Sequence, residues 1–236
     1  MKDIAKFVGK ERYTVEDLLE IITILRSPGG CPWDREQNHK SIRRDFLEEC
    51  YEAIEAIDTD NTELLREELG DVLLQVVFHS EIEREVGHFD FSDVVSGVAE
   101  KMVVRHPHVF ADTEADTTAQ VLSNWDKIKR ETKRQKTNRE VLESVSPAMP
   151  ALMRAQKVRK KAAGMGAETG DIEALQQEIC GAVCTATAEN GSEKLGRALF
   201  DMTELARKLG VDAERALFET CRAYIAQFES DASEEQ

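Results

Sequence analysis

Residues 46–75 read FLEECYEAIEAIDTDNTELLREELGDVLLQ and contain two helical patterns joined by a short polar turn. The first pattern carries Glu49 and Glu52, and the second carries Glu68 and Asp71. Residues three apart lie on one face of an α-helix, so each pair of carboxylates points in one direction. Because the turn lets the two helices lie antiparallel, the pattern predicts that four carboxylates converge between them.

Four neighbouring carboxylates predict a bound cation. Acidic side chains held close together repel one another and raise one another's pKa values unless a cation neutralises them. A ligand set made only of oxygen atoms suits a hard ion, so we predict Mg²⁺, with Mn²⁺ as the alternative. The same spacing also occurs on ordinary solvated helices. The neighbouring apolar positions Leu69 and Val72 favour the metal site, and both are expected to face inward, as is Leu73.

The composition predicts a helix-rich protein with a substantial core. The chain has 236 residues, of which 41% are hydrophobic and 33% are charged, and its net charge is −15. Because nucleic-acid binding depends on neutralising phosphates, we expect no nucleic-acid partner for so acidic a chain. An anionic substrate needs a bound metal and local Lys or Arg side chains to overcome the field of the protein.

The cysteines and the apolar stretches predict a cytoplasmic protein without a membrane partner. The five cysteines show no disulfide framework, and no signal peptide is evident at the N-terminus. The longest apolar stretch, residues 72–78, is too short to cross a bilayer. The histidines His39, His79 and His88 are scattered along the sequence, and no shared site is predicted for them.

Apolar periodicity predicts an all-α fold with little sign of strands. Thr14 is expected to cap the first helix and Gly87 to end the third. Residues 27–34 are rich in turn-forming residues, which predicts a loop. The expected helices cover residues 15–26, 41–57, 62–85, 92–105, 119–139, 151–163, 172–189, 192–209 and 213–229.

Two domains are expected, residues 1–143 and 144–236, because the segment 144–150 holds two of the five prolines and is typical of a linker. The sequence ELGDVLL that starts at Glu68 is similar to KLGRALF in the second half. The register of this repeat pairs Glu49, Glu52, Glu68 and Asp71 with Glu178, Gly181, Lys194 and Arg197. Three of the four predicted ligands have no counterpart, which predicts a degenerate second domain without metal.

Several motifs together resemble the MazG family of nucleoside triphosphate pyrophosphohydrolases. They are CPWD at 31–34, LEECYE at 47–52, ELGDVLLQVVF at 68–78 and RHPHVF at 105–110. The sequence LMRAQK at 152–157 is similar to the opening of the second domain in two-domain members. The resemblance implies tandem helical domains with a four-helix-bundle architecture that is completed by dimerisation. It also implies Mg²⁺-dependent hydrolysis of nucleoside triphosphates, including deoxynucleoside triphosphates, to monophosphates and pyrophosphate. The implied cellular role is housekeeping of the nucleotide pool.

The resemblance assigns roles to individual residues of the first domain. By motif position it implies the metal ligands Glu49, Glu52, Glu68 and Asp71. Lys101 and Arg105 match the phosphate-contacting pair of the family, although two solvated helix cations are the plain alternative. Glu48, the extra carboxylate beside the cluster, could orient or deprotonate the attacking water, or it could be an ordinary surface charge.

Three further residues are candidates for contact with the nucleotide. Trp33 could wall the pocket or act as a structural wedge. Trp125 could stack on the base with Lys129 nearby, and ordinary helix packing is the alternative. Since the second domain lacks the ligands, any activity belongs to the first.

The alternative to an enzyme is a non-catalytic nucleotide-binding protein or helical scaffold. A di-iron bundle requires a Glu-x-x-His motif on each of two helices. Such a spacing occurs at Glu85 to His88, where Gly87 interrupts it.

Overall fold

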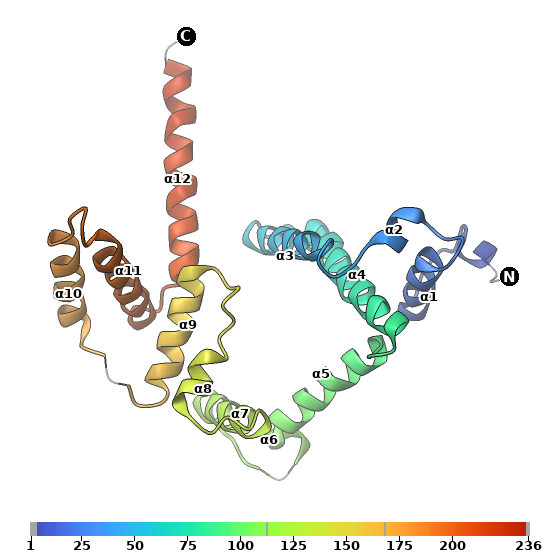
Figure 1. Cartoon of the computed structure of the whole chain (residues 1–236), viewed down its shortest axis with the longest axis horizontal. Coiled ribbons are helices and arrows are strands. Elements are labelled where there is room, and N and C mark those ends of the chain that lie inside the picture. Colours follow the sequence, from blue (N-terminus) through green and yellow to red (C-terminus); the bar gives the residue numbers. More distant parts are fainter. Residues whose placement is uncertain (1–3, 112, 168, 235–236) are drawn as a thin grey trace. The chain divides into compact units, whose positions relative to one another are not determined.

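The computed structural model describes residues 4–111, 113–167 and 169–234. These residues form one 3-10 helix, Ile4–Phe7, and twelve α-helices, and they contain no strand (Figure 1). The prediction of an all-α fold is therefore confirmed. The chain divides into two compact units, Met1–Val121 and Leu122–Gln236, which we call the first unit and the second unit.

The first unit is built around a pair of consecutive helices, α3 and α4, that pack against each other. Helix α1 packs on α4, and Ile22, Ile42, Val77 and Phe78 form the buried core between these elements. The helices of this unit are α1 (Val15–Arg26), α2 (Pro32–Glu36), α3 (Arg43–Asp58), α4 (Thr62–Val86), α5 (Phe91–Arg105) and α6 (Pro107–Phe110).

The ends of these helices follow from local chemistry. The Thr14 hydroxyl accepts a hydrogen bond from the backbone of Asp17, whose carboxylate accepts one from Thr14 in return. This capping box satisfies two backbone N–H groups that the helix itself leaves without partners. Gly87 ends α4 in the left-handed conformation at φ 78°, where a residue without Cβ is favoured. Both predicted helix ends are confirmed.

The second unit has a similar pair of packed helices, α10 and α11, with α9 against α11 and the start of α12 against α9. Ile179, Ala182 and Ala198 form its core, and Leu205 packs against them. The helices are α8 (Asn138–Glu143), α9 (Ala151–Ala163), α10 (Ile172–Cys184), α11 (Gly191–Lys208) and α12 (Ala213–Glu234), and α7 (Thr118–Thr132) crosses from the first unit into the second.

The prediction of one continuous helix over 119–139 is wrong. The chain leaves the helical conformation after α7, and Arg134 adopts a left-handed φ of 52°. Thr137 then caps the new helix α8 through a capping box with Glu140. The predicted loop 27–34 also contains the start of a short helix, α2, because Pro32 occupies its first turn, where a missing N–H costs nothing.

The inward orientation predicted for Leu69 and Leu73 is wrong for a single chain. These side chains are 54% and 37% exposed, because α3 and α1 cover other parts of the α4 surface. Contiguous apolar groups left in water are typical of a surface that another element covers.

The boundary between the two units falls between Val121 and Leu122, earlier in the chain than the linker expected at 144–150. The division into a catalytic and a degenerate domain stays a prediction. Over the part of the chain that is described, no helix is both long and apolar enough to cross a membrane.

Candidate metal centre

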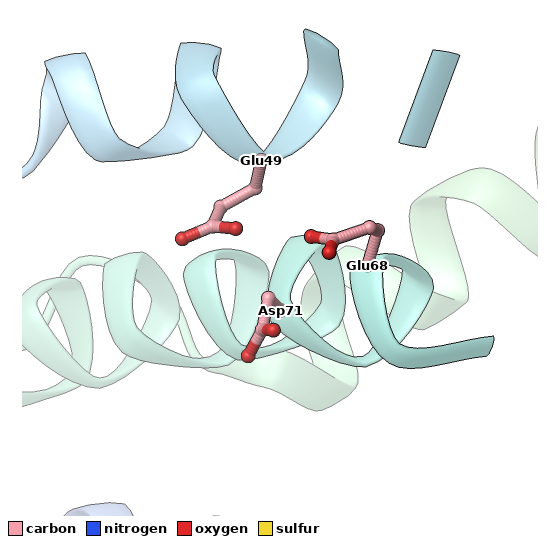
Figure 2. Close-up of side chains that lie close together, drawn as sticks. All are labelled: Glu49, Glu68 and Asp71. Carbon is pink, nitrogen blue, oxygen red and sulfur yellow. The ribbon is translucent and has the colours of Figure 1, made fainter. Parts of the chain in front are cut away.

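Three carboxylates from two helices lie together in the first unit. Glu49 extends from α3 toward α4, where Glu68 and Asp71 lie about one turn apart (Figure 2). One ligand oxygen from each of the three lies within 4.8 Å of the others. Among the described residues, no other group of three His, Cys, Asp or Glu side chains comes this close.

The close approach of α3 and α4 positions these carboxylates. Ala53 and Ala56 are the buried residues of α3, and such small side chains allow short distances between helix axes. The connecting turn is fixed by Asp60, at φ 52°, and by Asn61, whose side chain accepts a hydrogen bond from the Leu64 backbone. A tight turn therefore sets the register that brings carboxylates of the two helices together.

The electrostatics of the cluster favour a cation. Burial raises the pKa of Glu49, and the charges of Asp71, Glu52 and Glu68 raise it further. The pKa of Glu68, a side chain only 7% exposed, is raised by burial and then by Glu52 and Asp71. Protonation or a bound cation would relieve this repulsion, and a cluster made only of oxygen donors fits a hard divalent ion.

Glu52 and Glu48 lie at the margin of the cluster. Glu52 is exposed and is not one of the three clustered residues, but its charge acts on both Glu49 and Glu68. Glu48 is also exposed, and its Oε1 accepts a hydrogen bond of 2.8 Å from Nε of Arg44. The predicted roles of ligand and of base stay predictions.

The predicted phosphate-contacting pair lies on α5 of the first unit. Lys101 is exposed, whereas Arg105 is only 7% exposed. A surface-charge interpretation therefore does not apply to Arg105, because a guanidinium is rarely buried unless it has partners. The contact with phosphate stays a prediction for both residues.

Trp33 lies on α2 and is 59% exposed. Arg26 holds this helix in place, a role that the sequence did not predict. Arg26 donates to the carbonyl groups of Asp34 and Gln37, while its other nitrogens each bind a Glu85 oxygen at 2.8 Å. No sequence pattern links an arginine at the end of α1 to these distant partners.

The histidines described as scattered are joined by hydrogen bonds, so that interpretation is wrong. The Nδ1 atoms of His39 and His79 lie 2.7 Å apart, and Nε2 of His39 lies 2.6 Å from Glu83. His88 contacts the other oxygen of Glu83 at 2.6 Å. The spacing of His79 and Glu83 on one helix face was visible in the sequence, but their connection to His39 depends on tertiary folding.

Trp125 and Lys129 lie one turn apart on α7, both half-buried, in the second unit. The five carboxylates, the two cations of α5 and Trp33 all lie in the first unit. The predicted nucleotide contacts of Trp125 and Lys129 stay predictions.

The second unit has charged side chains of both signs at the positions that match the cluster. Arg197 Nη2 lies 3.7 Å from a Glu178 oxygen, and Arg197 Nε lies 2.6 Å from a buried Asp201 oxygen. These residues, with Lys194 and Glu193, line a cavity of about 260 Å³. A guanidinium therefore lies between α10 and α11, at the position that the predicted repeat register pairs with Asp71 of the first unit.

Residues 37–110 match the family model described as the MazG nucleotide pyrophosphohydrolase domain. The chain is 40% identical over 217 residues to the nucleoside triphosphate pyrophosphohydrolase/pyrophosphatase MazG of Thermotoga maritima, covering 90% of this chain and 83% of that protein. It is 38% identical over 213 residues to a nucleoside triphosphate pyrophosphohydrolase of Escherichia coli, covering 86% and 81% of the two chains. An uncharacterized protein of Bacillus subtilis, YabN, is 48% identical over 140 residues, which are 59% of this chain and 28% of that protein.

Proposed function

The chain belongs to the MazG nucleotide pyrophosphohydrolase family, and from this premise we propose that it hydrolyses nucleoside and deoxynucleoside triphosphates to monophosphates and pyrophosphate. We propose that the reaction depends on Mg²⁺, with Mn²⁺ as a substitute, and that it serves housekeeping of the nucleotide pool. The observation that carries this proposal is the cluster of Glu49, Glu68 and Asp71.

In the proposed mechanism, the clustered carboxylates would hold the metal, and Glu52 would be a further ligand from the margin. When bound, Mg²⁺ offsets charge on the phosphate oxygens and lowers the pKa of the attacking water. The water oxygen attacks the α-phosphorus, the bond to the bridging oxygen breaks, and pyrophosphate leaves with the electron pair. Glu48 accepts the proton of the water once its exposed contact with Arg44 opens, which costs little for a solvated pair.

The cations of α5 and the aromatic residues are proposed to position the substrate. Lys101 and Arg105 are four residues apart and share one face of α5, so both side chains can contact the same triphosphate chain. Fixed positive groups that meet developing charge are an effective way to stabilise a transition state. Trp33, Trp125 and Lys129 are proposed to contact the base and sugar.

We propose that the protein is a homodimer through the exposed apolar face of α3 and α4. This face contains Leu47, Tyr51, Ile54, Leu69 and Leu73. A second copy supplies a matching face, because an apolar surface related by two-fold symmetry is complementary to itself. Light scattering after size exclusion should find a dimer that Leu69→Glu converts to a monomer, while Leu122→Glu, an exposed apolar position outside the face, should leave it intact.

We propose a cytoplasmic location, without nucleic-acid or membrane partners. The five cysteines are all free thiols, which fits a reducing compartment. The net charge of −15 disfavours phosphate polymers as partners.

The experiment that tests the function measures pyrophosphate release from a panel of NTPs and dNTPs with Mg²⁺. Wild type should turn over at least one nucleotide, and both Glu49→Gln and Asp71→Asn should abolish this activity. Glu55→Gln is the matched control, since Glu55 is exposed on α3 and lies outside the cluster. A folded wild type that binds nucleotides without any turnover would favour the alternative, a nucleotide-binding or scaffold protein.

A further inference from the structure

Positive charge is concentrated in one segment of this acidic chain. Residues 122–165 contain twelve Lys or Arg and only four Asp or Glu, which is a net charge of +8 within a protein of −15. Arg139 and Arg159 are balanced by ion pairs with Glu143 and Asp201. Among the described residues, no carboxylate forms a salt bridge with Lys133, Lys157 or Lys160. This segment therefore carries cations that the described fold leaves unneutralised.

Several lysines of this segment act on Lys161 of α9. Burial lowers the pKa of Lys161, and the charges of Lys129, Lys133 and Lys157 lower it further. Asp126 is the one nearby carboxylate that acts in the opposite direction. Like charges gathered around a half-buried ammonium repel one another, and an anion placed among them would reverse this cost.

An apolar cavity lies beside this group of lysines in the second unit. Its volume is about 440 Å³, which is within the range of small-molecule sites. It lies between α8, α9, α11 and the segment that connects α8 to α9. Its lining includes Leu142, Pro147, Met149, Val158 and Phe200, with Arg154 as the cationic member. The acidic residue of the lining, Glu143, is bound to Arg139 at 2.7 Å and is therefore neutralised.

The cavity and the lysines form one continuous surface. Lys161 Nζ donates to the Val141 carbonyl at 3.3 Å and to the Ser144 hydroxyl at 3.2 Å, two residues that flank the cavity residues Leu142 and Glu143. On α9, Lys157 and Lys161 follow Arg154 by three and seven residues and therefore lie on the same face. The cationic row begins at the cavity wall and continues along the helix.

We propose that the second unit binds a nucleoside polyphosphate at this surface. The nucleoside occupies the cavity beside the Phe200 ring, which has the Arg159 guanidinium 4.0 Å from its centroid, and the phosphate chain lies along Arg154, Lys157 and Lys161. Neither element alone specifies this ligand, because the cavity suits an uncharged ring system and the cations suit any phosphate. Their junction fits a molecule that has an apolar end and a polyanionic end.

This ligand is bound and not hydrolysed. In the described part of the second unit, no cluster of carboxylates is present that could hold a metal. The residues that hold this ligand, Arg154, Lys157 and Lys161, differ from those of the proposed metal centre, and the site gives the second unit a role as a sensor of nucleotides.

The test uses the full chain with Asp71→Asn in EDTA, so that metal-supported binding at the first unit is removed. Isothermal titration calorimetry with ATP should find one saturable site per chain. In this background, Lys157→Glu and Arg154→Glu should each weaken ATP binding roughly tenfold, which corresponds to about 1.4 kcal/mol. Ala155→Trp, which fills the cavity, should also weaken it. Lys127→Glu is the matched control, because it reverses a charge in the same segment, on the face of α7 opposite Lys129. This substitution should change the affinity for ATP less than about twofold.

Two further measurements separate this proposal from its rivals. Each variant is first checked for an unchanged helical spectrum and thermal unfolding, and a variant that fails is replaced by the other charge reversal. Inorganic tripolyphosphate should bind more weakly than ATP. Absence of ATP binding at millimolar concentration, equal affinity for tripolyphosphate, or equal effects of Lys127→Glu and Lys157→Glu would each overturn the proposal. None of these outcomes depends on whether the first unit hydrolyses nucleotides.

Discussion

The helix pairs α3–α4 and α10–α11 are both pairs of consecutive helices that pack against each other, but they differ in the charges at their contact. Between α3 and α4, Glu49, Glu68 and Asp71 gather negative charge, and this charge together with burial raises the pKa values of Glu49 and Glu68. Between α10 and α11, Arg197 stands beside Glu178 and Asp201. The first pair is proposed to take a cation from solution, whereas the second carries a cation in its own sequence.

This difference separates what the scaffold requires from what function requires. Helices α10 and α11 pack together with cations, Lys194 and Arg197, at the positions that the predicted repeat register pairs with Glu68 and Asp71. Packing of such a helix pair therefore does not require these carboxylates, and a bound cation would offset their mutual repulsion. A cluster that is unfavourable for folding, and that the similar helix pair of the second unit lacks, is expected to serve chemistry.

The strongest way to break the comparison is to make the first unit resemble the second. Asp71→Arg places a guanidinium beside Glu49 and Glu68, as Arg197 does in the second unit. Pyrophosphate release should fall at least about a thousandfold, because the metal loses a ligand and meets a cation. Thermal unfolding should be unchanged or shift upward, since the new cation relieves repulsion. A variant that unfolds, or one that keeps its activity, would contradict this account of the cluster.

A change of pH should affect the two units with opposite sign. Glu204 in the second unit is fully buried, and two hydrogen bonds from Arg207 together with one from Thr169 hold its pKa at about 2. A depressed pKa means that its contribution is present above the ordinary value of 4.5 and is lost as the pH falls toward 2. This contribution is on the order of 3 kcal/mol for a shift of this size.

Glu49 and Glu68 behave in the other direction in the metal-free protein. Their pKa values are raised, so the folded first unit holds their protons more tightly than the unfolded chain and loses stability as the pH rises above 4.5. Unfolding followed by amide hydrogen exchange in EDTA should find α3 and α4 more protected at pH 5 than at pH 7. Helix α11 should lose protection only below pH 4.5, and Glu204→Gln should remove that loss. The same pH dependence in both units would contradict the assignment.

Mg²⁺ should stabilise one unit and not the other. A ligand that binds only the folded state adds about 2.7 kcal/mol at one hundred times its Kd. Hydrogen exchange should therefore slow in α3 and α4 on addition of Mg²⁺, while α10 and α11 remain unchanged. In Asp71→Asn the effect on α3 and α4 should disappear. Protection of α10 by Mg²⁺ would indicate a metal site in the second unit.

Local sequence signals predicted several helix boundaries and the meeting of the carboxylates of α3 and α4. The helices at 15–26 and 151–163 have the expected bounds, because caps and apolar periodicity act within a few residues. The carboxylates of α3 and α4 could be predicted to meet, since a short turn leaves few alternatives for the two helices. The break at Arg134 was missed because a left-handed residue other than Gly or Asn has no reliable sequence signal.

The parts that could not be predicted depend on contacts between distant residues. His39 meets His79 across forty residues, and Arg26 meets Glu85 across fifty-nine. The convergence of basic residues on Lys161 could not be predicted, because the sequence does not show that α7, α8 and α9 bring them together. Leu69 has the pattern of a core residue, and only the structure shows that no element of its own unit covers it.

The smallest predicted effect tests whether Arg197 acts as the built-in cation of the second unit. Arg197→Met removes the contacts with Asp201 and Glu178, but Asp201 keeps its ion pair with Arg159. The free energy of unfolding of this unit should therefore fall by only about 1–2 kcal/mol, the cost of losing one charged hydrogen bond while the buried carboxylate retains another. Denaturation can be followed in a Trp33→Phe background, where Trp125 is the remaining tryptophan and reports on the second unit. Lys194→Met is the control, since no described carboxylate pairs with Lys194, and its effect should stay within about 0.5 kcal/mol. Equal effects of the two substitutions would mean that the guanidinium is an ordinary surface charge, and the parallel between Arg197 and the metal of the first unit would then fail.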